Sequence, residues 1–385
     1  MALLEKYVTT TGDTTDHADT WTAASDIGAP ASLGVGLKYA AADDRVNIKA
    51  GVYDLSDDVA IMLAGGSAEP VNDGTQAAPI WWRGYSSVIG DATTPVVTLD
   101  ADSEAYIGVT GSQDFHIWDN IKVINNITNT EGFKATGDCN WFHRCWAAGV
   151  AGDGFDLAGN GNAVIGCEVS GSGSGTGHFG VLLGAGTSNQ VVGTYVHGGT
   201  GAGFRFNGTA SGNIVGCISA GNATHGITVD GDSAVRTKIV SGTTCWGNTL
   251  SGIHLERAAA AYNMPLILNN VLIARVPTGQ DGITTDRDGL IMLAGSAFDI
   301  VDGAAHQISS DIKVMEAVSR ITLSGDPCRD GTGHDFRVKR GLAFQSGWPG
   351  QFLVNGALTT WSGVPSIGAV NSRLPRFHGL TGGSR

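Results

Sequence analysis

Three carboxylate residues recur at one position of a repeated sequence phrase, where they could act on a substrate together. The phrase is a glycine, an apolar residue, any residue and usually a second apolar residue. The fourth residue after its glycine is Asp230, Glu256 or Asp286 in three successive copies. Carboxylates one coil apart would lie about 5 Å from each other, close to the carboxyl separation of retaining glycosidases. This spacing permits glycosidic bond hydrolysis, with Asp230 and Glu256 as nucleophile and acid.

Two basic side chains are expected beside this acidic column. His254 and Arg205 are the second residues after their phrase glycines, so both should point outward on the same face. His254 would support the catalytic carboxylates, and Arg205 would bind substrate. The chemistry is left open, because a strip of acidic residues on a soluble rod needs no function.

Calcium binding is the third interpretation of the same column. Asp230, Glu256 and Asp286 would supply the hard oxygen ligands that Ca²⁺ prefers. No other cofactor is predicted, and calcium remains an alternative to catalysis and to a plain surface.

Three aromatic residues form a second candidate site. Trp146 and Trp246 each follow a cysteine, and Tyr195 follows a threonine at the corresponding place. All three should face outward, where exposed aromatic rings stack on sugars or are buried against another subunit. Substrate binding, a subunit contact and partial cover by nearby loops all remain open for these residues.

The repeated phrase predicts the fold that positions these side chains. Its alternation of apolar and variable residues is that of a short strand, and it recurs about every two dozen residues. Three short strands per repeat, separated by Gly, Asn and Ser turns, predict an all-β chain folded as a single-stranded right-handed parallel β-helix solenoid. The phrase begins at Gly108, Gly132, Gly154, Gly180, Gly203, Gly226, Gly252 and Gly282.

The cysteines support this register. Cys145, Cys167 and Cys217 follow their phrase glycines at nearly equal distances, and Thr194 takes the matching place in the remaining coil. Stacking of like residues on like is typical of the interior of a solenoid. We therefore expect buried free thiols that pack as small apolar groups.

The ends of the solenoid require covers, because open ends would expose unpaired strand edges. The pattern predicts three segments: residues 1–43 as an N-terminal cap, 44–325 as the β-helix and 326–385 as a C-terminal cap or extension.

The composition restricts the partners of this chain. The net charge is −13 and no Lys or Arg cluster occurs, which argues against nucleic acid. No apolar run is long enough to span a membrane. The N-terminal residues also do not resemble a signal peptide, so we expect folding in a cytoplasm.

Segments near both ends resemble a known group. Thr11–Asp13, Asp19–Ala23 and Val46–Tyr53 look like the opening of pectate-lyase-like right-handed β-helix proteins, and Asp326–Val338 with Ile367–Val370 resembles their closing cap. This resemblance implies the fold strongly. It leaves function open, because the group includes lyases, hydrolases, epimerases, phage tailspikes and non-enzymatic virion proteins.

The resemblance and the expected cytoplasmic folding together favour a phage virion protein. We expect a homotrimer that serves as a head decoration, a fibre or a tailspike-like part, located in the virion and in contact with other virion proteins or a surface polysaccharide. An enzyme is the alternative: an extracellular or tailspike polysaccharide lyase or glycoside hydrolase. A glycan-binding module without catalysis is the third possibility.

Overall fold

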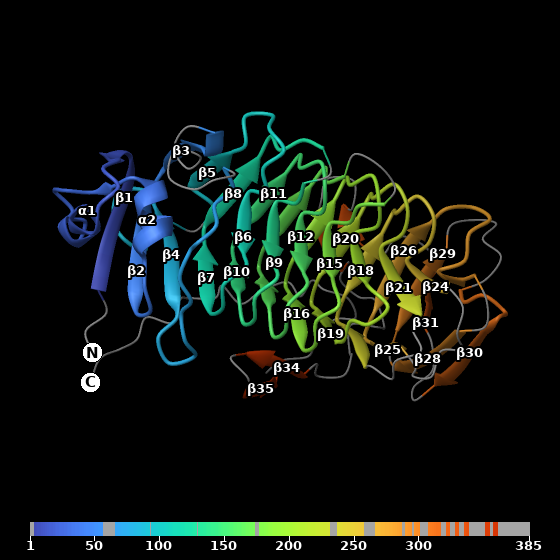
Figure 1. The fold of residues 1–385 in the computed structure, drawn as a ribbon. Coiled ribbons are helices and arrows are strands. Elements are labelled where there is room, and N and C mark those ends of the chain that lie inside the picture. The colour runs from blue at the N-terminus through green and yellow to red at the C-terminus, as the bar shows by residue number, and fades with distance from the viewer. Residues whose placement is uncertain are drawn as a thin grey trace.

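The short strands of the repeats assemble into three parallel sheets that run along the long axis of the molecule (Figure 1). The computed structural model describes residues 4–56, 66–92, 94–128, 130–173, 177–231, 237–257, 266–286, 289–294, 296–300, 307–316 and 321–323, with four short strands beyond. The chain is a right-handed parallel β-helix, as predicted.

From β6 (Val109–Gly111) to β29 (Ala297–Ile300) each coil contributes one strand to each sheet, and sheets A and B extend beyond sheet C at both ends. Sheet A contains β1 (Leu4–Asp13), β2 (Asp44–Lys49), β4 (Ile80–Tyr85), β7 (His116–Asp119), β10 (Trp141–His143), β13 (Ala163–Ile165), β16 (Asn189–Val192), β19 (Gly212–Val215), β22 (Lys238–Ser241), β25 (Leu266–Asn269), β28 (Gly289–Ala294) and β30 (Ile312–Glu316). Sheet B contains β3 (Gly51–Asp54), β5 (Val97–Asp100), β8 (Ile121–Ile124), β11 (Trp146–Ala148), β14 (Glu168–Ser170), β17 (Tyr195–His197), β20 (Ile218–Ala220), β23 (Thr244–Trp246), β26 (Leu272–Val276), β29 (Ala297–Ile300) and β31 (Ile321–Leu323).

Sheet C is made from the repeated phrases. Its strands are β6 (Val109–Gly111), β9 (Phe133–Ala135), β12 (Phe155–Leu157), β15 (Val181–Leu183), β18 (Phe204–Phe206), β21 (Ile227–Gly231), β24 (Ile253–Arg257) and β27 (Ile283–Thr285). Every phrase glycine immediately precedes one of these eight strands, so the predicted register is confirmed. Glycine is required there: a Cβ on Gly154 would lie 2.5 Å from Val169 Cγ1 and 2.6 Å from the Gly180 carbonyl oxygen.

The interior is filled by aligned rows of like residues. Phe133 and Phe155 stack with their ring centroids 4.6 Å apart, and Phe142 packs against both. Stacked rings of this kind bury a large apolar area in an ordered geometry.

The cysteine ladder lies in the same core. Cys145, Cys167, Thr194 and Cys217 are all buried, and the three cysteines are free thiols. This confirms the packing role expected for them.

A buried row of asparagines stabilises the turns that precede several sheet A strands. Asn140, Asn162 and Asn189 are fully buried. The side-chain Oδ1 of each accepts a hydrogen bond from a backbone N–H one coil earlier, at 2.7 Å between Asn140 N and Asn162 Oδ1 and 2.9 Å between Asn162 N and Asn189 Oδ1. Turn amides that would otherwise be buried without a partner are thereby satisfied.

The N-terminal segment both covers the end of the solenoid and adds a strand to it. β1 pairs in parallel with β2 and so extends sheet A. Two short helices, α1 (Ala18–Ala23) and α2 (Leu33–Tyr39), follow, and the Ser32 side chain caps α2 by accepting a hydrogen bond from the Val35 N–H. Residues 1–43 are therefore more than a separate cap.

Beyond residue 326 the structure describes two antiparallel strand pairs. β32 (Cys328–Asp330) pairs with β33 (Asp335–Val338), and β34 (Gln351–Val354) pairs with β35 (Ala357–Thr360). The rest of the predicted C-terminal cap lies outside the described residues. No helix in the described part of the chain is long and apolar enough to cross a membrane.

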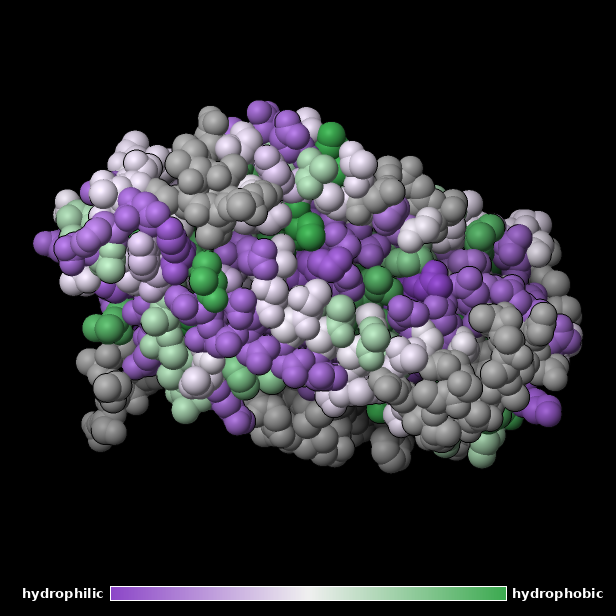
Figure 2. All heavy atoms as spheres, in the orientation of Figure 1, coloured by the Kyte–Doolittle hydropathy of each residue, from purple (hydrophilic) through white to green (hydrophobic). Residues whose placement is uncertain are grey.

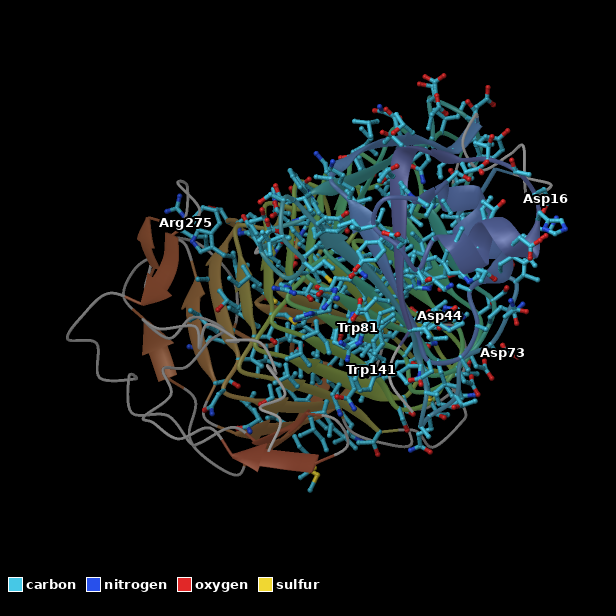
Figure 3. The ribbon with its side chains drawn as sticks, turned by 90° about the vertical axis from the view of Figure 1, so that its left-hand side faces the viewer. Asp16, Asp44, Asp73, Trp81, Trp141 and Arg275 are labelled. Atoms are coloured by element: carbon cyan, nitrogen blue, oxygen red, sulfur yellow. The ribbon has the colours of Figure 1, made fainter. Side chains whose placement is uncertain are left out.

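An end-on view shows how one outer row of sheet A is formed (Figure 3). Trp81 and Trp141 lie together near the centre of this view, because both pair with Ile117 of the strand between them. Asp16 and Arg275 lie at opposite margins. Residues far apart in sequence thus share a row whenever they occupy equivalent positions in neighbouring coils.

Candidate functional site

The outer face of sheet C brings three of the predicted site residues into direct contact. Asp230 and Glu256 are register partners on β21 and β24. Arg205 of β18 donates to Asp230 Oδ2 from Nη2 at 2.6 Å and from Nε at 3.2 Å, and the same Nη2 lies 3.2 Å from Glu256 Oε2. One guanidinium therefore holds two carboxylates on successive coils.

The two carboxylates have different environments. The Asp230 side chain is 17% exposed and the Glu256 side chain 44%. Burial raises the pKa of Asp230, and the neighbouring Glu256 raises it further, whereas Arg205 opposes both effects. Oδ1 of Asp230 is buried and has no hydrogen-bond partner among the described residues. Asp230 is thus the more buried carboxyl of the pair, and its burial opposes ionisation.

Arg205 is fixed from a second side. Its Cζ atom lies 4.6 Å from the centre of the Phe179 ring, which is a cation–π geometry. Phe179 is itself buried, in the loop that precedes β15. The guanidinium position is therefore set jointly by the carboxylates and by an aromatic platform.

His254 and Asp286 form a second contact on the neighbouring coils. His254 Nε2 lies 3.4 Å from Asp286 Oδ1, and His254 Nδ1 is hydrogen-bonded to Thr284 Oγ1 at 3.0 Å. Burial lowers the pKa of His254, while Asp286 partly counteracts this shift. At neutral pH the imidazole is neutral, so it can accept a proton.

Only two of the three carboxylates in the predicted column share a contact. Strand pairing between β24 and β27 ends at Leu255 and Thr285, one residue before Asp286. Asp286 contacts His254, whereas Asp230 and Glu256 contact Arg205.

Calcium binding receives no geometric support from this arrangement. Within the described ranges, no three His, Cys, Asp or Glu side chains are grouped so that they could hold a metal ion. The contact that Asp230 and Glu256 share is made with the Arg205 guanidinium. A calcium site at Asp230, Glu256 and Asp286 stays a prediction that would require these side chains to rearrange.

A histidine that was missed in the sequence extends the network. The ring of His225 stacks on that of His254, with centroids 4.3 Å apart and an interplanar angle of 10°. His225 Nδ1 is hydrogen-bonded to Ser251 Oγ at 2.6 Å, and Ser251 Oγ also lies 3.0 Å from Thr284 Oγ1. The missed signal is positional: His225 and Ser251 each directly precede a phrase glycine, one coil apart.

A second charged cluster lies farther toward the N-terminal end of the same face. Lys134 of β9 contacts Glu131 at 2.8 Å and Asp156 of β12 at 3.5 Å. Figure 2 shows that hydrophilic residues dominate the face over which β12 to β24 run in Figure 1. The outer face of sheet C is thus a mainly polar strip over several coils, which Leu182 interrupts between Asp156 and Arg205.

The predicted aromatic residues lie on a different sheet. Trp146 and Tyr195 belong to strands of sheet B, not of sheet C. Lys122 Nζ lies 3.9 Å from the centre of the Trp146 ring, and Tyr195 stacks on His197 at 4.3 Å. One face of each ring is therefore already in contact with a neighbouring side chain.

Trp246 is also on sheet B, but its register differs from the expectation. Trp246 pairs with Ala220 and Ala274, whereas Tyr195 pairs with Ile218 in the other outer row. The reason is that Cys245 is not part of the cysteine ladder; it pairs with Ser219, which pairs with Val196. The three aromatics therefore do not form one row.

Comparison with solved structures identifies the fold. A crystal structure of pectate lyase Pel9A matches with a TM-score of 0.57 and 15% identity, covering 95% of this chain and 96% of that chain. A rhamnogalacturonan lyase matches with a TM-score of 0.59 and 15% identity, covering 83% and 87%. The fold is that of the pectate-lyase-like β-helix proteins. No family model matches the sequence, and neither does any curated protein sequence.

This pectate-lyase-like likeness is one of backbone architecture. At such identities it shows the fold alone and assigns no role to any side chain. The chemistry of the chain has to be argued from the residues on the outer face of sheet C.

Proposed function

We propose that this chain is a polysaccharide-degrading enzyme, and specifically a glycoside hydrolase that binds its substrate on the outer face of sheet C. The observation that carries the proposal is the pair formed by Asp230 and Glu256. They are register partners, both contact Arg205 Nη2, and they differ in burial. Two adjacent carboxyls whose environments favour different protonation states can divide the acid and nucleophile roles.

The difference in burial supports a specific division of roles. Asp230, whose pKa is raised, would donate its proton to the departing glycosidic oxygen while the more exposed Glu256 attacks the anomeric carbon. A water molecule, deprotonated by Asp230, would then cleave the bond between the sugar and Glu256 and release the product. This reverses the order expected from the sequence. A proton on Asp230 Oδ1 would displace no hydrogen bond among the described residues, and a flip of the carboxyl would bring it to the exposed side.

The remaining residues of the network would orient the pair. Arg205 would hold both carboxylates in place until a sugar hydroxyl competes for the exposed Glu256. His254, whose two ring nitrogens face Asp286 and Thr284, would line the substrate site beside the pair. These roles use proton transfer and positioning by the chain's own residues.

The charge of this face favours a neutral glycan over a uronate polymer. Among the sheet C side chains that the structure describes, the outward cations are Lys134 and Arg205, and each already contacts two carboxylates. Elimination from a uronate requires neutralisation of the substrate carboxylate, which a predominantly acidic strip does not favour. This comparison supports hydrolysis over elimination.

The test is an activity screen of the purified full-length protein on neutral and uronate-containing polysaccharides. Asp230→Asn and Glu256→Gln are compared with wild type and with Glu104→Gln, a control at an exposed loop residue outside the site. Reducing ends that appear with wild type and the control but not with either site variant support the proposal. Unsaturated uronate products would overturn hydrolysis in favour of elimination, and the absence of turnover on all substrates would overturn the enzyme proposal.

Glycan binding without catalysis is the second candidate. The observation that favours it is the set of partly exposed aromatic rings of Trp146, Tyr195 and Trp246 on sheet B. Because Lys122 and His197 occupy one face of two of these rings, a sugar would stack on the opposite face. Retention on a glycan array that Trp146→Ala abolishes, without turnover, would favour this function.

The virion assignment is a separate proposal. A phage particle location, a homotrimer and contacts with other virion proteins rest on the sequence considerations alone. A tailspike depolymerase would combine this assignment with the hydrolase proposal.

A further inference from the structure

Asp153 makes a buried contact that the proposed reaction does not use. It directly precedes the phrase glycine of β12 and is 7% exposed. Its Oδ1 accepts a hydrogen bond of 2.6 Å from the backbone N–H of Phe179, which lies one coil closer to Arg205. A short hydrogen bond to a carboxylate is among the stronger contacts that a backbone amide makes.

Phe179 connects this contact to the proposed catalytic pair. Its N–H is bound by Asp153, and its ring lies under the Arg205 guanidinium at 4.6 Å. Arg205 in turn holds Asp230 and Glu256. The path from Asp153 to the carboxyl pair therefore consists of three direct contacts without a gap.

We propose that Asp153 is a positioning residue of this site and that it fixes Arg205 through the backbone of Phe179. The inference rests on the proposed function for its catalytic consequence, but the mechanical coupling does not depend on which reaction occurs. An ionised Asp153 anchors the Phe179 backbone firmly. A protonated Asp153 accepts the same hydrogen bond more weakly and so leaves the aromatic platform less constrained.

Four charged or titratable groups surround Asp153. Asp156 is on β12, Glu131 and Lys134 belong to the preceding coil, and His178 in the loop before β15 has its Nδ1 3.9 Å from Asp153 Oδ1. Burial is the main cause that raises the pKa of Asp153 to about 7, and the negative charges of Asp156 and Glu131 act in the same direction. The hydrogen bond from Phe179 and the positive charge of Lys134 lower the pKa. The anchoring contact would therefore change strength within the neutral pH range.

The experiment follows the Phe179 amide and the Arg205 Nε–H by NMR of the full-length protein, through a pH range centred on about 7. In wild type, we expect both signals to shift with a common midpoint. In Asp153→Asn, both shifts should disappear, because Asn accepts the same hydrogen bond but does not titrate. In Phe179→Leu, the Arg205 response should disappear while the amide of residue 179 still titrates.

Asp156→Asn is the matched control, since it removes a nearby charge but no contact with Phe179. Its expected effect is a lower midpoint with both shifts preserved. If Arg205 Nε titrates identically in wild type and Asp153→Asn, the coupling is refuted. These signals need no substrate, so a failure of the hydrolase proposal is recognised separately.

Enzyme kinetics test the catalytic consequence of the positioning role. In Asp153→Asn, we expect kcat/KM to fall about tenfold above the wild-type midpoint and to lose its dependence on pH around that midpoint. A pH profile unchanged from wild type would refute the positioning role.

Discussion

The imidazole rings of His225 and His254 stack face to face, with their centroids 4.3 Å apart. Burial lowers the pKa of His225 to about 3, and the adjacent His254 contributes to the shift. Both rings are consequently neutral at neutral pH. The stacked pair should lower the free energy of unfolding in acid, because two neighbouring imidazolium ions would repel each other.

Acid should therefore destabilise the wild-type protein through His225. The unfolded chain binds a proton near pH 6.5, but the folded His225 does so only near pH 3, so stability is lost as the pH falls below about 6.5. Between neutral pH and about pH 5 we expect a loss of about 2 kcal/mol from this group. Urea denaturation of wild type and His225→Gln at both pH values measures it. An equal loss in both proteins would contradict the assignment, and the exposed His17→Gln serves as the control.

Asp153 should have the opposite effect on the pH dependence of stability. Its pKa is higher in the folded state than in the unfolded chain, so the stability it contributes is present at low pH and is lost as the pH rises from about 4 through about 7. Asp153→Asn should therefore gain stability over wild type at mildly alkaline pH, by about 2–4 kcal/mol relative to their difference at pH about 4. Denaturation curves at the two pH values test the sign, and a constant difference would show that Asp153 does not titrate in this range.

Removal of the Arg205 guanidinium should destabilise the fold by leaving Asp230 unpaired. Arg205→Ala is expected to cost about 2 kcal/mol, a value reduced from that of fully buried pairs because Arg205 is 23% exposed. Asp230→Asn in the Arg205→Ala background should recover part of this loss, since the uncompensated charge disappears. Additive costs in a double-mutant cycle would show that the two side chains do not interact.

The cysteine ladder should resist thiol reagents in the native protein. Cys145, Cys167 and Cys217 are buried, and burial raises the pKa of Cys217 to about 12. Cys139 is less buried, so it should be labelled before the ladder cysteines. Mass spectrometry of labelled peptides in native and urea-unfolded samples gives the order. Rapid native labelling of Cys167 would contradict the packing described for it.

Light scattering tests the expected trimer. The homotrimer proposal requires a solution mass near three times the 39.6 kDa of one chain. A monomer at micromolar concentration would exclude it for the isolated protein.

The repeated phrase predicted much of the fold because a solenoid converts sequence period directly into spatial neighbours. The residues from Lys134 to Thr284 at the second phrase position all belong to sheet C strands as expected. The pairing of Asp230 with Glu256 followed from the same period.

The period could not predict contacts that depend on side-chain direction or on strand ends. Asp286 lies just after the end of β27, where its side chain contacts His254. Trp246 was misplaced because a cysteine in the neighbouring interior row was mistaken for a member of the ladder. Phe179 lies in a turn before its strand, and turns carry no alternation that indicates which way a ring points.

The parallel register of sheet C also sets the distances along the polar strip in steps of one coil. Each coil advances the chain by about 4.8 Å, so the separation between the Lys134–Asp156 cluster and the Arg205–Asp230 cluster is counted in whole coils. Insertion or deletion of one complete coil between them would change their spacing by one fixed step and leave the internal geometry of each cluster intact. Under the proposed function, adding or removing one coil would be expected to change the preferred length of the substrate without replacing any residue that contacts it.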